Sequence, residues 1–333
     1  MDDSALMRRA IEAAASVRAS TSPNPWVGAA LRTVDGTVFV GATEPPGGRH
    51  AERVALDAAA AAGADVAGST LAVTLEPCCH TGRTGPCTTA LLAAGVGRVL
   101  VGVDDPDPRV SGRGLEALAA GGVEVSCGVC DDEISEQLAP YLHHRRTGRP
   151  WVVLKLASTL DGRLAAPDGT SKWITGELAR ADVHRLRAIS DAVLVGAGTV
   201  RHDDPELTVR LVEGRDPRRV VLGAAPTGAR VHPCTEWSGP VEGLLDVLGR
   251  EGVVQVLVEG GAHVAGAMLR AGLVQQVLLY LAPAFFGGDD ALPMLAGPSV
   301  PTIAALRRGR LVSVDRLGDD LRLDIRSLQQ EDH

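Results

Sequence analysis

The stretch STLAVTLEPCCHTGRTGPCTTALLAAG, residues 69–95, joins a strand to a helix through an unusual loop. Its first part is rich in apolar and β-branched residues, which predicts a buried strand over 69–76. Its last part is rich in alanine and leucine and stops at Gly95, which predicts a short helix over 88–95. Three cysteines lie close together around the loop. They indicate a disulfide cluster, a structural metal site or a catalytic metal site.

Strands and helices alternate on both sides of this stretch. Asp35-Gly36 is a hairpin turn signal between two apolar runs. The pattern predicts strands at 27–33, 37–43, 69–76, 97–103 and 123–129, and helices at 1–20, 50–63, 88–95 and 114–122. A hairpin followed by strand–helix units predicts a three-layer α/β domain.

A second α/β run follows the polar segment 141–150, which we interpret as a linker. A chain of 333 residues is long for one hydrophobic core, so we expect two domains, at 1–146 and 150–333. The second half predicts strands at 151–159, 191–196, 218–223, 253–259 and 274–283, helices at 177–190, 239–252 and 262–272, and a closing hairpin around Gly318-Asp319.

The composition excludes several classes of protein. Hydrophobic residues make up 45% of the chain and charged residues 22%, as in a globular protein, and the formal net charge is −8 with one short basic stretch at 143–149. A nucleic-acid-binding protein is expected to show a basic stripe. The sequence has no apolar run of membrane-spanning length and no signal-peptide core. We therefore expect a cytoplasmic protein with reduced thiols, which argues against a disulfide cluster.

A histidine and a glutamate upstream complete a metal-site pattern. His50-Ala51-Glu52 begins a predicted helix, Pro77-Cys78 follows a strand, and Cys87 precedes a helix. His-x-Glu followed by Pro-Cys is the signature of zinc-dependent deaminases, although Cys87 stands nine residues after Cys78 instead of three. Zinc lowers the pKa of its bound water to about 7. A carboxylate that is not a ligand is then needed to carry a proton to the leaving ammonia, and we assign this role to Glu52.

The other cysteines invite alternatives. A structural zinc site would recruit a fourth ligand, which Cys79 or His80 could supply. Otherwise we expect Cys79 to be a buried thiol. Cys127 and Cys130 form a C-x-x-C pattern without a histidine or second pair nearby, so we interpret them as buried small hydrophobic residues. Cys234 shows no pattern that points to a function.

Several longer motifs resemble a known family, the bifunctional deaminase–reductases of riboflavin biosynthesis. The first half carries TSPNPWVGAAL (21–31), HAERVAL (50–56), VTLEPCCHTGRTGPC (73–87) and DPDPRVSGRGLEAL (105–118). The second half carries LKLASTLDGRLA (154–165), SKWIT (171–175), GAGTVRHDDPELTVR (196–210) and LVEGGAHVAGAML (257–269). The resemblance implies a cytidine-deaminase-like three-layer αβα domain followed by a dihydrofolate-reductase-like α/β domain.

The resemblance also implies two reactions and their cofactors. The first domain would use one zinc ion to deaminate 2,5-diamino-6-ribosylamino-4(3H)-pyrimidinone 5′-phosphate. The second would use NADPH to reduce the ribosyl group, giving 5-amino-6-ribitylaminouracil 5′-phosphate. The family's zinc ligands fall on His50, Cys78 and Cys87 and its proton shuttle on Glu52. The family positions that hold the substrate phosphate fall on His80 and Arg83, and another position that contacts the substrate falls on Asn24.

Three positions in the first domain depart from the family pattern. Trp26 stands where asparagine is usual, Thr43 stands where a histidine is frequent, and Cys79 stands where serine is usual. None of them removes a zinc ligand, but they leave the fine shape of the deaminase pocket open.

Two glycine turns mark the second site. Gly196–Val200 and Gly260-Gly261 each follow a predicted strand, and glycines let a phosphate approach the N–H groups of a helix N-terminus. The chain lacks G-x-G-x-x-G at both places, so a Rossmann site is not indicated. By resemblance the NADPH contacts are Ala157, Trp173, Thr199, Asp203, Gly261, Ala262, His263, Val264, Ala265, Gly266 and Ala267. The reductase substrate contacts are Ser171, Arg187, Leu207, Arg210 and Glu259.

Charged residues suggest roles in the reductase site. Arg187 and Arg210 are suited to grip a phosphate, because a guanidinium matches phosphate oxygens bidentately. Lys155 lies on a mostly apolar strand and needs a partner, either the sugar or an acid such as Asp203. Gly223-Ala224 departs from the family's Asp-Ser, and residues 230–252 look short by one strand. Both changes bear on the choice between NADPH and NADH.

Three rival hypotheses remain open at this point. A nucleic-acid-editing deaminase would share the zinc site, but it offers no use for the second domain. A structural-zinc protein, or an enzyme with one activity, would have a degenerate reductase half. A paralogue would carry out the same chemistry in secondary metabolism. We expect a small-molecule substrate, no nucleic-acid or membrane partner, and a homo-oligomer formed through the reductase domain.

Overall fold

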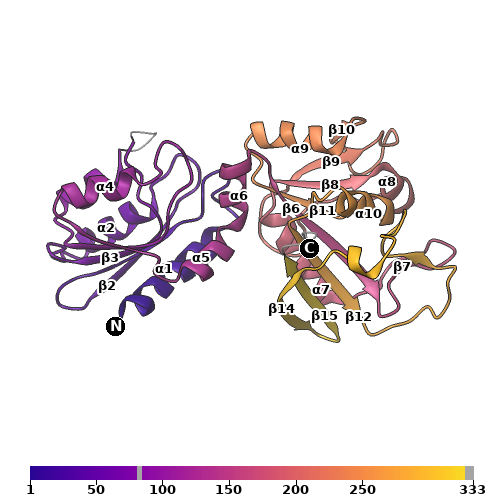
Figure 1. Cartoon of the computed structure of the whole chain (residues 1–333), viewed down its shortest axis with the longest axis horizontal. Coiled ribbons are helices and arrows are strands. Elements are labelled where there is room, and N and C mark those ends of the chain that lie inside the picture. Colours follow the sequence, from indigo (N-terminus) through magenta and orange to yellow (C-terminus); the bar gives the residue numbers. More distant parts are fainter. Residues whose placement is uncertain (81–84, 327–333) are drawn as a thin grey trace. The chain divides into compact units, whose positions relative to one another are not determined.

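The computed structural model describes residues 1–80 and 85–326 and divides the chain into two compact units (Figure 1). Unit 1 is Met1–Gly148 and unit 2 is Arg149–His333. Each unit has a sheet built from strands of its own segment. In the described parts of the chain, no helix combines the length and apolar character that a membrane span requires.

Unit 1 is built on a mixed sheet of five strands in the order β2-β1-β3-β4-β5. The β1–β2 hairpin turns at Gly36, whose positive φ of 91° suits a glycine. β1 is antiparallel to β3, and β3, β4 and β5 are parallel. The strands are β1 Gly28–Arg32, β2 Val38–Ala42, β3 Thr70–Leu75, β4 Arg98–Val103 and β5 Glu124–Cys127; the helices are α1 Asp3–Val17, α2 Ala51–Ala61, α3 Cys87–Ala93, α4 Arg113–Ala120, α5 Asp131–Gln137 and α6 Ala139–Thr147.

Helices cover both faces of this sheet, as the sequence predicted. α1 packs closely over β1, because a Cβ on Gly28 would collide with the backbone of Ala10. α2 packs on the opposite side, where a Cβ on Gly41 would collide with the backbone of Ala51 and Ala55. These two glycines, on paired strands, bring α1 and α2 into close contact with the sheet. The first turn of α2, which holds His50 and Glu52, is thereby fixed.

Unit 2 is built on a sheet of eight strands in the order β10-β9-β8-β11-β6-β12-β15-β14. The strands from β10 to β12 in this order are parallel, and the C-terminal hairpin β14–β15 adds antiparallel strands beside β12. The strands are β6 Trp151–Thr159, β7 Arg163–Ala165, β8 Ala192–Gly196, β9 Arg218–Leu222, β10 Thr235–Trp237, β11 Gln255–Val258, β12 Gln276–Ala282, β13 Leu292–Pro293, β14 Arg310–Leu317 and β15 Asp320–Arg326; the helices are α7 Glu177–Ala188, α8 Ala197–Asp203, α9 Val241–Arg250, α10 Ala262–Arg270 and the 3₁₀ helix η1 Ile303–Ala305.

The sheet of unit 2 has a hydrophobic core on each face. α9 and α10 pack on one face through residues such as Leu245 and Met268. α7 and α8 pack on the other face through residues such as Val183 and Val200. Alternate residues of the central strands contribute to one core or the other, so Leu194 faces the first and Val195 the second. This arrangement places the carboxyl ends of the parallel strands at one edge, where ligands bind in α/β sheets.

Two expectations from the sequence were wrong and a third was incomplete. The segment 141–150, interpreted as a linker, contains the boundary between the two units after Gly148, but most of it is helix α6, with Tyr141 buried. The region expected to lack a strand contains the short edge strand β10. Cys127 is exposed and Cys130 only half-buried, because β5 is the edge strand of its sheet and ends there.

Candidate active sites

The three predicted zinc ligands converge in unit 1. His50 caps α2, Cys78 follows β3, and Cys87 is the first residue of α3. Nδ1 of His50 lies 3.5 Å from Sγ of Cys78 and 3.4 Å from Sγ of Cys87. All three ligand atoms lie within 4.8 Å of one another. Tetrahedral zinc with ordinary Zn–S and Zn–N bonds separates such atoms by about 3.6 Å, so the donor set fits a zinc ion without rearrangement.

The electrostatics around these ligands favour a metal-binding thiolate. A hydrogen bond from Cys87 and another with His50 hold the pKa of Cys78 well below its usual range, at about 4. The backbone N–H of Cys87 also donates to Sγ of Cys78 at 3.4 Å. The N-terminus of α3 thus supports the negative charge.

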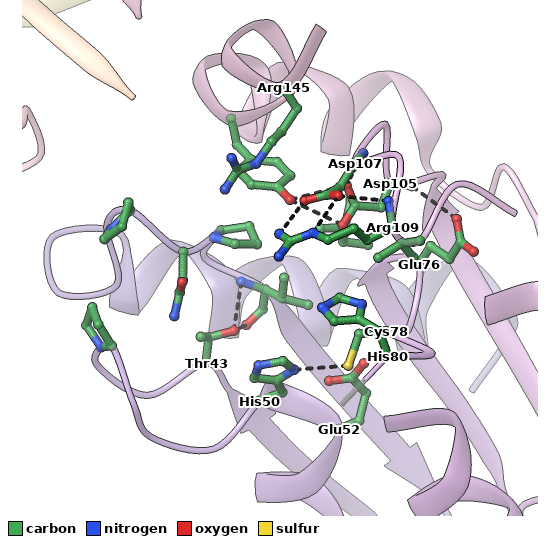
Figure 2. A pocket seen from close by; sticks show the side chains of 18 of the residues that line it. Thr43, His50, Glu52, Glu76, Cys78, His80, Asp105, Asp107, Arg109 and Arg145 are labelled. Atoms are coloured by element: carbon green, nitrogen blue, oxygen red, sulfur yellow. Dashed lines mark hydrogen bonds and ion pairs between the residues drawn. The ribbon is translucent and has the colours of Figure 1, made fainter. Parts of the chain in front are cut away.

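Glu52 lies beside this centre on the first turn of α2. Its side chain is buried, with only 4% of the residue exposed, and Figure 2 shows it next to His50 and Cys78. Burial raises the pKa of Glu52 to about 7. A carboxyl group that titrates near neutrality can both take up and release a proton at physiological pH.

A cavity of about 470 Å³ opens above these residues. Its lining includes Asn24 and His80, two of the predicted substrate contacts, whereas Arg83 lies outside the described residues. Thr43 also lines the cavity, where its hydroxyl accepts a hydrogen bond from the backbone N–H of Val27 at 3.2 Å.

Trp26 does not contribute to the described lining of this cavity. Its indole N–H donates to the carbonyl oxygen of Gln137 at 3.2 Å, and its ring stacks with Arg18. Any effect of Trp26 on the pocket is therefore indirect, through the neighbouring Pro25 and Val27, which do line it. Cys79 is half-buried rather than buried, and its thiol faces the carbonyl oxygen of Arg109 at 3.7 Å.

The far wall of the cavity contains residues that the sequence did not single out. Arg109 forms a bidentate ion pair with Asp107, at 3.0 and 2.7 Å. The hydroxyl of Tyr141 donates to the carboxylate of Asp105 at 3.2 Å. Arg145 stacks over the ring of Tyr141, 5.0 Å from its centroid, and Figure 2 shows Arg145 at the end of the pocket away from Glu52. The motif at 105–118 covers the β4–α4 part of this wall, but no motif covers Tyr141 and Arg145, which α6 contributes.

Glu76 connects that wall to the sheet. Its carboxylate accepts hydrogen bonds from the backbone N–H groups of Asp105, Gly112 and Gly114, at 3.3, 3.0 and 2.9 Å. Because one side chain satisfies three backbone donors, it fixes the β4–α4 loop beside the metal ligands. Sequence reasoning missed this role; the DPDPRVSGRG loop next to β3 was the available signal.

Unit 2 contains a buried charge cluster at the predicted reductase site. Arg187 donates from Nε and Nη2 to the carboxylate of Glu259, at 2.6 and 2.9 Å, and from Nη1 to the carbonyl oxygen of Thr208 at 3.0 Å. Lys155 lies nearby, and its burial lowers the pKa of its amine. The acid that interacts with Lys155 is Glu259 rather than Asp203.

Other predicted reductase residues surround this cluster. The backbone N–H of Arg210 donates to Nδ1 of His184 at 3.0 Å, while its exposed guanidinium pairs with Glu206. Leu207 is buried with a positive φ of 57°. Ser171, the remaining predicted substrate contact, is half-buried in the loop before α7.

The two glycine turns meet at the carboxyl ends of β8 and β11. A Cβ on Gly261 would lie 3.0 Å from Oγ1 of Thr199, and one on Gly196 would lie 2.9 Å from a methyl group of Val264. The N-terminal ends of α8 and α10 are therefore side by side, as two turns that hold one dinucleotide should be.

The predicted cofactor contacts on α10 differ in how deeply they are buried. Ala265 and Gly266 face inward, and a Cβ on Gly266 would collide with the carbonyl oxygen of Ala296. The first turn of α10 is thus the part that presents backbone N–H groups. The other predicted cofactor contacts lie outside α10. Trp173 is 69% exposed and stacks with Arg180, and Ala157 lies on β6. The carbonyl oxygen of Asp203 accepts a hydrogen bond from Lys172 at 3.2 Å.

Comparisons with known proteins agree with this arrangement. The family described as the cytidine and deoxycytidylate deaminase zinc-binding region matches residues 1–103, and the RibD C-terminal domain matches residues 150–323. The chain is 42% identical to the riboflavin biosynthesis protein RibD of Mycobacterium tuberculosis, over 96% of either chain. It is 35% identical to that of Bacillus amyloliquefaciens, over 95% of this chain and 94% of the relative.

Solved structures give the same result. RibD of Acinetobacter baumannii superposes with a TM-score of 0.91 and 37% identity, over 98% of this chain and 99% of that one. The diaminohydroxyphosphoribosylaminopyrimidine deaminase/5-amino-6-(5-phosphoribosylamino)uracil reductase of Thermotoga maritima superposes with a TM-score of 0.90 and 35% identity, over 97% and 98% of the two chains.

The fold and the sites define an enzyme that joins a zinc-type nucleotide deaminase domain to a reductase domain. The chain belongs to the RibD family, the bifunctional deaminase–reductases of riboflavin biosynthesis. The resemblance inferred from the sequence motifs and the predicted fold class are both confirmed.

Proposed function

We propose that unit 1 deaminates 2,5-diamino-6-ribosylamino-4(3H)-pyrimidinone 5′-phosphate and that unit 2 then reduces the ribosyl group with NADPH. The observation that carries the first step is the convergence of His50, Cys78 and Cys87 beside the buried Glu52. These three ligands would hold one zinc ion, which supplies an activated water at neutral pH.

The residues of unit 1 then carry the proton. The water oxygen bonds to the ring carbon that bears the amino group, and Glu52 accepts the proton that this water loses. Glu52 gives the proton to the amino nitrogen, the carbon–nitrogen bond breaks, and ammonia leaves. Its pKa near 7 suits a group that must do both at one pH.

The substrate's phosphate would lie at the opposite end of the pocket. The guanidinium Nε of Arg145 and Nδ1 of His80 are buried and have no hydrogen-bond partner among the described residues. Arg109 is already held by Asp107. We therefore assign the phosphate to Arg145, with His80 as a second contact. A cationic partner is needed because four carboxylates also line the cavity and would repel a dianion. They are those of Glu52, Glu76, Asp105 and Asp107.

The reductase step needs a hydride and a proton at the sugar. When bound, NADPH would supply the hydride for C1′ of the ribosyl group. The ring oxygen of the sugar would then need a proton as its bond to C1′ opens. We assign this proton to Lys155, a buried acid whose pKa is lowered by desolvation. The adjacent glycine turns at Gly196 and Gly261 would hold the cofactor, and Arg210 would reach the phosphate from the exposed rim.

One incubation tests both halves. The purified chain is given the diaminopyrimidinone ribosylamino phosphate with and without NADPH, and the products are identified by mass. Without NADPH we expect one deaminated product and released ammonia; with NADPH we expect the ribityl product. A parallel reaction with NADH tests the cofactor preference. Deamination without any reduction would support an enzyme with a degenerate reductase half.

A further inference from the structure

Unit 2 contains a second group of metal-binding side chains, far along the chain from the first. His232 and Cys234 precede the edge strand β10, with Pro233 between them in a bend, and Glu236 lies on the strand. The ligand atoms of the three residues lie within 4.8 Å of one another.

The spacing within this group matches that of the deaminase metal centre. Sγ of Cys234 lies 3.5 Å from Nδ1 of His232, the same distance that separates Cys78 from His50. This is close to the separation of about 3.6 Å expected for a thiolate and an imidazole on one tetrahedral zinc ion. A histidine, a cysteine and a carboxylate are each ordinary zinc ligands.

Hydrogen bonds outside the group orient two of the three ligands. Nε2 of His232 lies 3.1 Å from the carbonyl oxygen of Pro226, which can only accept, so Nε2 carries the hydrogen and Nδ1 keeps its lone pair. One oxygen of Glu236 accepts from the backbone N–H of Ala225 at 2.9 Å. A backbone carbonyl behind the histidine and a donor behind the carboxylate are the usual supports of metal ligands.

We propose that His232, Cys234 and Glu236 bind a thiophilic divalent cation of the Zn²⁺ class, separately from His50, Cys78 and Cys87. A thiolate and a carboxylate balance the charge of the cation, and binding releases the thiol proton. The ion links edge strand β10 to the loop 225–231, to which two of its ligands are already hydrogen-bonded. Solvent supplies the remaining ligand, because His232 and Glu236 are exposed.

Metal content per chain tests this site. The full chain is dialysed against buffered zinc, passed through a desalting column and analysed for zinc and protein. We expect two zinc ions in the wild type, one in Cys234→Ser, one in Cys87→Ser and none in the double variant. Cys127→Ser removes an exposed thiol that belongs to neither group and should retain two. His232→Gln should repeat the result of Cys234→Ser without changing a thiol.

A second measurement separates binding at this site from a general loss of folding. Cobalt bound to a thiolate gives a ligand-to-metal charge-transfer band, and its titration should show two steps in the wild type and one in Cys234→Ser. Ammonia release by Cys234→Ser should be unchanged. One zinc ion in the wild type would overturn the proposal. So would a second ion that Cys234→Ser retains, which would be an adventitious ion only.

Discussion

The carboxylate of Glu259 accepts two hydrogen bonds from the guanidinium of Arg187, at 2.6 and 2.9 Å, and the side chains are only 8% and 11% exposed. The guanidinium of Arg187 is therefore held in one position from within unit 2. Because Lys155 contributes a further positive charge beside Glu259, the cluster is net cationic when its amine is protonated. Such a cluster suits an anionic ligand.

The Arg187–Glu259 pair should show the behaviour of a buried ion pair. Glu259→Met leaves a buried guanidinium without its partner and should destabilise unit 2 by about 3–5 kcal/mol, whereas the double variant Arg187→Met/Glu259→Met should recover part of this loss. Three of the four tryptophans lie in unit 2, so urea unfolding followed by tryptophan fluorescence reports mainly on this unit. Glu177→Met, at a position that is 94% exposed, serves as the control. Equal losses in the single and double variants would contradict the coupling.

Glu52→Gln should keep the zinc ion and lose ammonia release. The change removes the proton carrier without removing a ligand, and such losses are on the order of 10²-fold or more. The measurements are zinc per chain and the initial rate of ammonia release, with the exposed Glu12→Gln as control. Near-normal ammonia release by Glu52→Gln would require another base.

Arg145→Ala should weaken substrate binding in the deaminase step. Loss of a charge-assisted contact to phosphate costs roughly 1.5–3 kcal/mol, or about 10- to 100-fold in kcat/KM. The loss should appear mainly in KM, and Arg145→Lys should restore part of it. The neighbouring Arg146 is exposed, so Arg146→Ala is the matched control. An equal effect of both alanine variants would remove the phosphate assignment.

Arg210→Ala should raise the KM of the reductase step and leave ammonia release unchanged. The side chain of Arg210 is 48% exposed and paired with Glu206, so solvent screening reduces its contribution. We expect an effect of roughly three- to tenfold, smaller than a buried phosphate contact would give. A parallel fall in deamination would mean that the two activities depend on a shared site or on common packing.

Periodic segments were predictable from the sequence, and irregular ones were not. Strands such as β3 and β6 are mostly apolar runs, and their length and composition identify them. Helix α6 was missed because His143–Arg146 is polar, while its burial depends on Pro140 and Tyr141 packing inward. A local pattern cannot show which side of such a segment another element covers.

In the candidate sites, too, residues in a local sequence pattern could be predicted, and residues brought together only by the fold could not. His50, Glu52 and Cys78 could be predicted as a group because zinc requires histidine and thiolate donors, and because the deaminase signature places the proton-carrying glutamate two residues after the histidine. Glu76 and Arg145 were not, because their roles come from a loop and a helix that the fold brings to the cavity. The group His232, Cys234 and Glu236 was also missed, since the proximity of its ligand atoms depends on the bend before β10, which no sequence pattern predicted.

The division of the chain at Gly148 has a genetic consequence. Each unit has its own sheet and its own candidate site, so an allele that damages one site leaves the other intact. Two alleles encoding Glu52→Gln and Lys155→Met should therefore complement each other in one cell that depends on this enzyme for riboflavin. The first chain reduces what the second has deaminated, provided that the intermediate diffuses between them. Growth without added riboflavin measures this, and neither allele alone should support it.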